Sequence, residues 1–454
     1  MTTNYQIAEA SVKYLAEAVG QVLPAGYKQT EAGPIPEDWD CKPFGDLFET
    51  NIKRKSIKEA DLISFVGMQD VTESAQLSKC SLLKYNEIKS GFTYFENDDV
   101  LLAKITPCFE NVKGCIIKDL PTEVGFGSTE FHVLRAKENS DSGFIYFWTT
   151  RASFRKILES EMVGSAGHRR VPISAIRAYQ IPCPREKTEQ TAIANALSDV
   201  DALINELEKL IAKKRAIKTA TMQQLLTGRT RLPQFTLRED GTPKGHKPSE
   251  LGEIPEDWEV VEVGNVCNLL TGFPFPSNKY ANTGIRLLRG SNVKRNCTDW
   301  GDDITQYWPE ITSNIKQYEL ELGDIVISMD GSLVGRSYSQ LTTKDLPALL
   351  LQRVARLRTD YVALSYLKEW ICSRFFTEHC DLVKTVTAIP HISPQDIRIF
   401  KFLLPQNQEE QTAIASILSD MDTEIQALQQ RLAKPRHIKQ GMMQELLTGR
   451  TRLI

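Results

Sequence analysis

Several signatures of common protein classes are missing from this sequence of 454 residues. The nine cysteines nowhere form C-x-x-C, so neither a zinc ribbon nor a disulfide framework is expected, and a reducing, cytoplasmic compartment fits best. No run of 18 apolar residues occurs, so we expect no membrane span. The amino terminus lacks a basic start followed by an apolar run, and therefore does not look like a secretory signal.

Catalytic motifs are missing as well. Gly-Lys never occurs, which excludes a G-x-x-x-x-G-K-[ST] phosphate loop, and G-x-G-x-x-G, H-E-x-x-H and G-x-S-x-G are absent. The Asn-Pro-Pro-aromatic run of amino-methyltransferases is absent too. Cys372, His379 and Cys380 fall close together, but their apolar helical surroundings favour a core role over a metal site. We expect no catalytic residue, metal or cofactor in this chain.

An excess of positive charge is also missing. The chain has 55 Lys and Arg against 58 Asp and Glu, a formal charge of -3. Its hydrophobic content of 41% is ordinary, which excludes disorder, and its length suffices for two to four domains. Composition alone therefore gives no sign of a nucleic-acid partner.

A long internal repeat is the main feature that is present. Residues 189–232 and 410–453 align without a gap, from EQTAIA to LLTGRTRL, with 27 identities in 44 positions. IPEDW occurs at residues 35–39 and again at 254–258, so two copies of one unit fill nearly the whole chain. Between these anchors the copies diverge. Similar segments could dock one kind of partner while dissimilar segments recognise two targets; plain duplication with drift is the alternative.

Both similar segments carry an apolar heptad stripe, which predicts long helices over about residues 187–226 and 408–447. Each helix would be roughly 60 Å long and could act as a spacer, and an antiparallel pair would bury both stripes. Gly228 and Gly449 suit left-handed helix C-caps, whereas Pro435 should kink or interrupt the second helix. The stripe positions are Ile193, Leu197, Val200, Ile204, Leu207 and Ile211, with Ile414, Leu418, Met421, Ile425, Leu428 and Leu432.

The divergent segments each have the length of one domain. Short β-type runs at residues 100–105, 131–134, 325–328 and 354–357 alternate with helical stretches at 144–161 and 361–381. We predict an α+β protein with an internal pseudo-two-fold repeat, in which two mixed α/β domains are joined by two long antiparallel coiled-coil helices. The predicted segments are an N-terminal helical segment (1–33), the first domain (34–184), the central helix (185–232), a linker (233–252), the second domain (253–405) and the C-terminal helix (406–454).

Basic clusters in both divergent domains are candidates for DNA contact. Arg and Lys neutralise phosphates and pair bidentately with guanine, while Asn and Gln suit adenine. Neither domain is basic overall, since residues 34–184 hold 19 basic and 21 acidic side chains and residues 253–405 hold 16 and 19. Solvated surface is therefore the alternative, and DNA binding would depend on a local patch.

The order of these motifs resembles the specificity subunit of type I restriction-modification enzymes. Two divergent domains, each opened by IPEDW and followed by a heptad helix from EQTAIA to LLTGRTRL, cover essentially the whole chain after residue 25. The resemblance implies that residues 34–184 and 253–405 are target-recognition domains, each reading one half of a split double-stranded DNA sequence. It further implies helices that set the spacing and dock two methyltransferase subunits.

Those partner subunits would transfer a methyl group from S-adenosylmethionine to adenine N6, and translocating restriction subunits would complete the nuclease. The chain itself would have no catalytic activity. Two other hypotheses stay open. One is an interaction scaffold whose coiled coil holds two protein-binding domains, and the other is a DNA-modifying enzyme with cryptic catalytic residues.

The family gives no fixed code for base contacts, so we predict them from loop position and chemistry. The loops GMQDV and RGSNV occupy equivalent places in the two copies and differ in chemistry. The residues predicted to contact DNA are Lys53, Arg54, Gln69, Asp70, His168, Arg169 and Arg170 in the first domain, and Arg289, Ser291, Asn292, Lys294, Arg295, Arg336 and His391 in the second.

Overall fold

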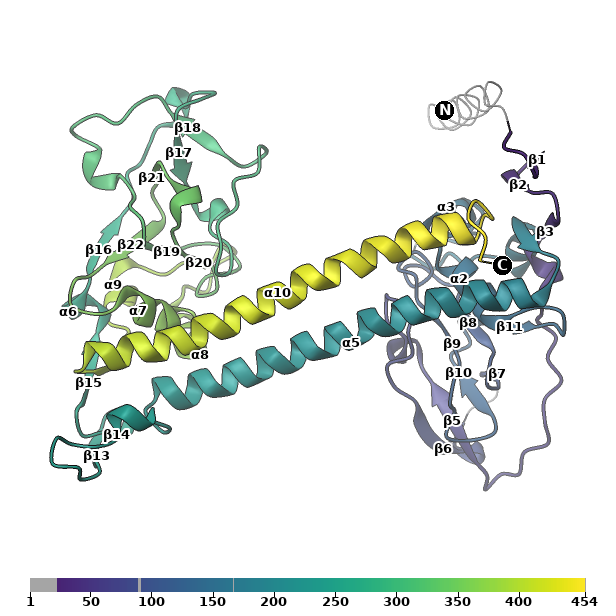
Figure 1. The fold of residues 1–454 in the computed structure, drawn as a ribbon, viewed down its shortest axis with the longest axis horizontal. Helices are drawn as coiled ribbons and strands as arrows, with labels where there is room; N and C mark the ends of the chain where they lie inside the picture. Colours follow the sequence, from purple (N-terminus) through teal and green to yellow (C-terminus); the bar gives the residue numbers. More distant parts are fainter. Residues whose placement is uncertain (1–22, 89–90, 166, 454) are drawn as a thin grey trace. The chain divides into compact units, whose positions relative to one another are not determined.

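The computed structural model describes residues 23–88, 91–165 and 167–453. The chain divides into two compact units: unit 1 is Met1–Glu208 with Gln430–Ile454, and unit 2 is Lys209–Gln429. Each unit therefore combines one divergent domain with parts of both long helices (Figure 1). Within the described ranges, no helix has both the length and the apolar character needed to cross a bilayer.

Unit 1 is built from small sheets packed against short helices. The strands β5 and β10 pair in parallel, whereas the other strand pairs of this unit are antiparallel. Two of its sheets have two strands each, β1-β2 (Tyr27–Thr30, Gly33–Pro36) and β12-β3 (Gln180–Pro184, Trp39–Pro43). The other two have four strands each, β6-β5-β10-β7 (Ser81–Lys84, Leu62–Val66, Gly125–Gly127, Thr93–Phe95) and β4-β11-β8-β9 (Phe48–Glu49, Phe131–Ala136, Val100–Ala103, Gly114–Ile116). The helices of the domain are α2 (Ser142–Thr150), α3 (Ala152–Ser160) and α4 (Ile173–Ala178).

Unit 2 repeats this plan, with β17 and β21 as its parallel pair. Its sheets are β13-β14 (His246–Ser249, Gly252–Pro255), β15-β23 (Trp258–Glu262, Lys401–Pro405), β16-β22-β19-β20 (Asn268–Thr271, Val354–Arg358, Ile325–Ser328, Tyr338–Gln340) and β18-β17-β21 (Gln306–Trp308, Ile285–Leu288, Ala348–Leu350). Its helices are α6 (Val263–Val266), α7 (Leu364–Ile371), α8 (Arg374–Val383) and α9 (Pro394–Arg398).

The long helices are α5 (Lys187–Leu226) and α10 (Gln408–Leu446). Within each unit they run antiparallel, because rising residue numbers on α5 pair with falling numbers on α10. In unit 1, Asp201 and Glu208 pair with Lys439 and Arg436, and in unit 2, Lys214 and Lys218 pair with Glu424 and Asp422. Each helix is followed within three residues by a glycine with positive φ, as predicted, with values of +67° at Gly228 and +71° at Gly449. The antiparallel arrangement of the helices and the mixed α/β character of the domains are confirmed.

The heptad stripe packs against the domains as well as against the partner helix. Ile193 and Leu197 belong to the main core of unit 1, and Ile414 and Leu418 belong to the main core of unit 2. Within this stripe Val200, Met421 and Leu428 are only partly buried. Each helix therefore begins inside a domain core, and its seam with the other helix is shorter than the sequence pattern suggested.

Four expectations need correction. The segment 1–33, predicted to be helical, contains β1 and the first residue of β2, and its residues 1–22 lie outside the described ranges. The predicted linker contains β13, which pairs with β14. The stretches 144–161 and 361–381 are each two helices, because Arg151 and Ser373 have extended backbone.

The fourth correction concerns Pro435, which does not interrupt α10. A proline inside a helix removes one backbone donor. Here Pro435 is buried, Leu432 on the preceding turn is buried, and the ion pair of Arg436 with Glu208 at 2.5 Å holds the following turn against α5. The helix therefore continues through Pro435, on a stretch where Leu432, Pro435 and Arg436 contact the rest of unit 1.

Candidate nucleic-acid interface

Two loops in equivalent positions form the first half of the candidate interface. Residues 67–70 follow β5 in unit 1, and residues 289–292 follow β17 in unit 2. In each loop the backbone N–H of the fourth residue donates to the carbonyl of the first, at 3.1 Å in unit 1 and 2.9 Å in unit 2. The same backbone frame therefore presents Gln69 in one unit and Ser291 in the other, and both side chains are exposed.

Asp70 and Asn292 build these loops from inside. The Asp70 carboxylate accepts the Gly67 N–H at 2.8 Å, and Asn292 Oδ1 accepts the Arg289 N–H at 3.1 Å. Asn292 Nδ2 donates to the carbonyl of Asp299 at 2.9 Å. Both side chains are buried, so their predicted contact with DNA is wrong: their polar atoms cap the turn and are not presented to a base.

The second half of the candidate interface lies where β8 and β19 end. In unit 1, Lys104 N–H donates to the carbonyl of Glu130, and Val171 N–H donates to the carbonyl of Lys104, both at 2.9 Å. In unit 2, Met329 takes the place of Lys104: the Met329 N–H donates to the carbonyl of Arg353, and the Ile392 N–H donates to the carbonyl of Met329, both at 2.9 Å. We call the recognition edge residues 67–70, 104–106, 128–130 and 168–171 of unit 1 and residues 289–292, 329–331, 352–353 and 390–392 of unit 2.

The side chains on this common frame differ between the units. In unit 1, Arg170 forms two hydrogen bonds with the Glu130 carboxylate, at 2.8 and 2.9 Å, and these bonds lower the pKa of Glu130. In unit 2 the place of Glu130 is taken by Arg353, which lies 3.7 Å from Asp330. The charge at this place is therefore reversed from one unit to the other.

Several predicted basic side chains already have protein partners. Arg169 donates to the carbonyl of Glu159 at 2.8 Å, and Arg289 donates to the carbonyl of Ile304. Arg336 forms a pair with Asp381 at 2.7 Å. An arginine engaged in this way contacts a phosphate or base only with its remaining donors, so these residues position the loops as well as offering charge.

Other predicted residues are more accessible. His168, Arg295 and His391 are exposed, and Lys294 is only loosely paired, 3.7 Å from Asp299. Lys294, Arg295 and Arg336 gather around the start of β20, because Tyr338 bridges to Arg295 and bonds to Lys294.

Lys53 and Arg54 are exposed but are not brought to the recognition edge. Their neighbour Lys55 pairs with Glu123 at 2.8 Å, two residues before β10 begins at Gly125. The loop at 67–70 follows the other end of the sheet, where Val66 pairs with Gly127. The structure therefore divides the predicted residues of unit 1 into two groups.

Sequence reasoning overlooked a buried junction that each repeat motif helps to build. In unit 1, Glu189 accepts hydrogen bonds from Arg452 at 2.9 Å and from Trp39 Nε1 at 3.2 Å. In unit 2, Glu410 accepts from Arg231 at 2.7 Å and from Trp258 Nε1 at 3.3 Å. The motifs IPEDW, EQTAIA and TGRTRL meet here in both units. Their repetition in the sequence is the signal from which the junction could have been predicted.

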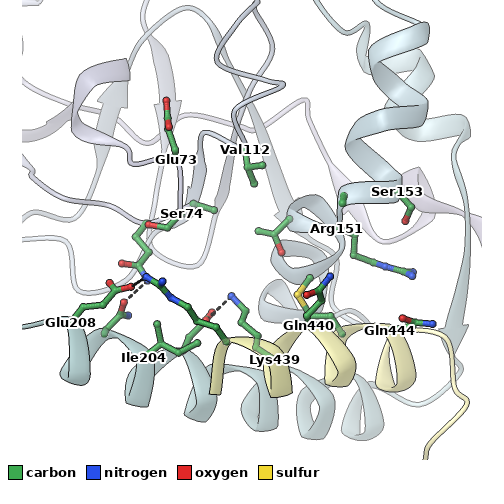
Figure 2. A pocket seen from close by; sticks show the side chains of 18 of the residues that line it. Glu73, Ser74, Val112, Arg151, Ser153, Ile204, Glu208, Lys439, Gln440 and Gln444 are labelled. Carbon is green, nitrogen blue, oxygen red and sulfur yellow. Dashed lines mark hydrogen bonds and ion pairs between the residues drawn. The ribbon is translucent and has the colours of Figure 1, made fainter. Parts of the chain in front are cut away.

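A groove in unit 1 lies between the domain and the two long helices, with a volume of about 660 Å³ (Figure 2). Ion pairs of Arg436 with Glu208 and of Lys439 with Asp201 stand on its helical wall. On the domain side the Arg151 guanidinium lies 4.6 Å from the Trp148 ring, and burial lowers its pKa. The groove therefore combines residues of the divergent domain with residues of the repeated helices.

Comparison with known proteins identifies the family. Residues 36–219 and 255–434 each match the model of the type I restriction modification DNA specificity domain. These two matches cover more than half of the chain, and they coincide with the two copies of the repeat. The chain belongs to this family.

Named relatives agree with this assignment. The chain is 28% identical over 480 residues to the type I restriction enzyme EcoAI specificity subunit of Escherichia coli, covering 89% of this chain and 80% of that protein. It is 26% identical over 438 residues to the type I restriction enzyme MjaVIII specificity subunit of Methanocaldococcus jannaschii, covering 94% and 96%.

Among solved structures, the S subunit of a type I restriction-modification system from M. genitalium matches with a TM-score of 0.55. The match covers 94% of this chain and 98% of that chain, at 14% sequence identity. At this identity the likeness concerns the fold alone.

Proposed function

We propose that this chain is a non-catalytic DNA-recognition subunit in which each recognition edge reads one half of a bipartite double-stranded target. The observation that carries the proposal is the contrast between one backbone frame and two sets of side chains. Gln69 and Ser291 occupy the same place on the two frames, and Arg170 and His391 occupy another. Equivalent frames with different donors and acceptors suit two unlike base sequences.

We infer further that the repeated helices dock two copies of one methyltransferase subunit. The residues of the second repeat copy that line the groove of unit 1 support this reading, because the first copy carries the same residue at most of the matching positions. Arg436, Lys439, Met443, Gln444, Thr448 and Arg450 correspond to Arg215, Lys218, Met222, Gln223, Thr227 and Arg229. S-adenosylmethionine and the catalytic residues for methylation at adenine N6 would then belong to the partner, and restriction subunits would join this complex.

The test is the methylation pattern of cells that express this chain with its methyltransferase partner. We expect methylated adenines in one split motif, with two specified halves separated by unspecified bases. In a parallel culture, the double variant Gln69→Ala with Ser291→Ala should give a methylated motif that is less specific in both halves. Cells without any split adenine motif would contradict the proposal.

Two alternatives remain distinguishable. A protein scaffold predicts no salt-dependent DNA binding by the assembled complex, whereas phosphate contacts predict that affinity falls steeply as salt rises. A DNA-modifying enzyme predicts methyl transfer or cleavage by the purified chain alone. Assays of the chain with and without its partner subunits separate these outcomes.

A further inference from the structure

Arg356 is a buried arginine of unit 2. Among the described residues, no carboxylate lies within ion-pair distance of its guanidinium. Its side chain lies on β22, and the residue is 5% exposed. Nη2 donates to Asn268 Oδ1 at 2.6 Å, while the buried Nε has no hydrogen-bond partner in the described part of the chain. Burial and the nearby Arg358 lower the pKa of Arg356. A buried charge without a counter-ion is costly to the folded state.

Unit 1 indicates that the fold does not require this charge. Val133 holds the same register position on β11 that Arg356 holds on β22, and it is 6% exposed in an apolar core. Two residues further along each strand, an arginine pairs with the aspartate just before the neighbouring strand: Arg135 with Asp99 at 2.7 Å and Arg358 with Asp324 at 2.8 Å. The ion pair is therefore common to both units, and Arg356 is an addition in unit 2.

Arg356 lines a pocket of about 660 Å³ where β22 ends. Leu322 and Tyr361 are also part of the lining, and they are 64% and 66% exposed. Arginine and tyrosine are enriched among the residues that dominate protein–protein binding energy, particularly where apolar neighbours exclude water. Arg356, Leu322 and Tyr361 are therefore residue types suited to binding a protein segment, on a wall that also holds Glu321, Asp324 and Asp360.

We propose that this pocket receives an aspartate or glutamate side chain of a partner protein, held by the Arg356 guanidinium, while apolar residues beside it pack on Leu322 and Tyr361. An acidic occupant would give Arg356 the counter-ion it lacks, because among the three wall carboxylates Glu321 and Asp324 are paired with Arg358, and Asp360 forms no ion pair with Arg356. The pocket lies at the opposite end of β22 from Arg353 on the recognition edge. The inference rests on the proposed function, because that proposal assigns DNA to the recognition edge at the Arg353 end of β22.

The test selects random 12-residue peptides displayed on phage against the full chain. We expect the selected peptides to carry an acidic residue next to apolar residues. Synthetic versions should bind Arg356→Val at least ten-fold more weakly than the wild type. Arg356→Gln, which keeps a donor for Asn268 without the charge, should lose the same affinity, whereas Lys316→Ala, a change at an exposed lysine of the same unit, should not.

Equal peptide affinity for the wild type and Arg356→Val would overturn the proposal, as would selected peptides without acidic residues. We also expect Arg356→Val to melt at a higher temperature than the wild type, because valine suffices at this position in unit 1. Lower melting temperatures for both Arg356 variants would instead assign the charge a structural role and contradict the proposal.

A parallel measurement uses duplex DNA at matched salt. A ten-fold loss of DNA affinity in Arg356→Val would assign a DNA phosphate to the pocket and overturn the choice of a protein ligand. Failure of the wild type to bind DNA would count against the proposed function alone, since the peptide measurement contains no DNA.

Discussion

Unit 1 and unit 2 share their supporting contacts and differ at their recognition edges. Each has a buried glutamate that accepts from an arginine and a tryptophan, and each has a bidentate arginine–aspartate pair inside its domain. At the edge, Glu130 stands where unit 2 has Arg353, and Arg170 stands where unit 2 has His391. Repeated residues hold the frame, and the residues that differ occupy the surface that a ligand could reach.

A second difference lies where the helices meet the domains. In unit 1, Lys439 pairs with Asp201 and lies 5.6 Å from the ring of Phe147. In unit 2 the equivalent Lys218 pairs with Asp422 and lies 3.7 Å from the buried carboxylate of Glu369. One repeated ion pair is thus supported by an aromatic ring in one unit and by further charges in the other, because the divergent domains supply the third group.

The largest expected effect concerns the two junctions. Arg231 is 9% exposed and Arg452 is 32% exposed, so the charge in unit 2 is better shielded from water. Removing one partner of a buried ion pair typically costs about 3–5 kcal/mol, and exposed pairs cost much less. We expect Arg231→Ala to lower the free energy of unfolding by about 3 kcal/mol and Arg452→Ala by about half as much.

Chemical denaturation of the two variants, followed by tryptophan fluorescence, measures both losses in unfolding free energy. Arg229→Ala, a change at the neighbouring exposed arginine, is the control. A larger loss for Arg452→Ala would reverse the predicted order of the junctions.

The next effect concerns the third group beside each repeated lysine. Glu369→Gln leaves Lys218 and Lys368 to share the single carboxylate of Asp422, at 2.6 and 3.4 Å. We expect a loss of about 2 kcal/mol in unfolding free energy, because a buried charge network loses one of its two acids. Unchanged stability at neutral pH would show that Glu369 is dispensable to this network.

An effect of similar size is expected on DNA specificity. Gln69→Ala should reduce discrimination in one half of the DNA target by about 1–3 kcal/mol, and Ser291→Ala should act on the other half only. Methylation kinetics on duplexes with one altered base per half measure both effects. Equal losses in both halves from one substitution would contradict the assignment of one unit to each half.

The smallest effect depends on pH. Hydrogen bonds from Arg336 and Lys384 lower the pKa of Asp381 from 3.8 to about 2. Because the folded-state pKa is depressed, the stabilisation is present above the ordinary pKa and is lost as pH falls from 3.8 through about 2. Urea midpoints should therefore separate the wild type from Asp381→Asn at pH 7 and converge near pH 2. A difference that persists at pH 2 would assign the effect to packing.

Much of the fold could be predicted because it depends on periodic or repeated sequence. The heptad stripes and the terminal glycines predicted α5 and α10 to within one residue at their C-terminal ends. The interruption at Pro435 was predicted wrongly, since a local propensity was outweighed by the packing of α10 on α5. The breaks at Arg151 and Ser373 were missed because apolar residues continue on both sides of each break.

The candidate interface was only partly predictable. The loops at 67–70 and 289–292 could be found by aligning the two copies, but Asp70 and Asn292 point inward, and sequence does not distinguish a capping side chain from a base-reading one. Glu130 and Arg353 were not considered, because their positions at the edge arise from pairing between distant strands.

The most direct test of the central claim exchanges residues 34–184 for the corresponding domain of another specificity subunit and then maps adenine methylation in cells that contain the partner subunits. The account predicts that one half of the split motif changes and that the half read by unit 2 is retained. A change in both halves, or in neither, would contradict the claim that each unit reads its own half of the target.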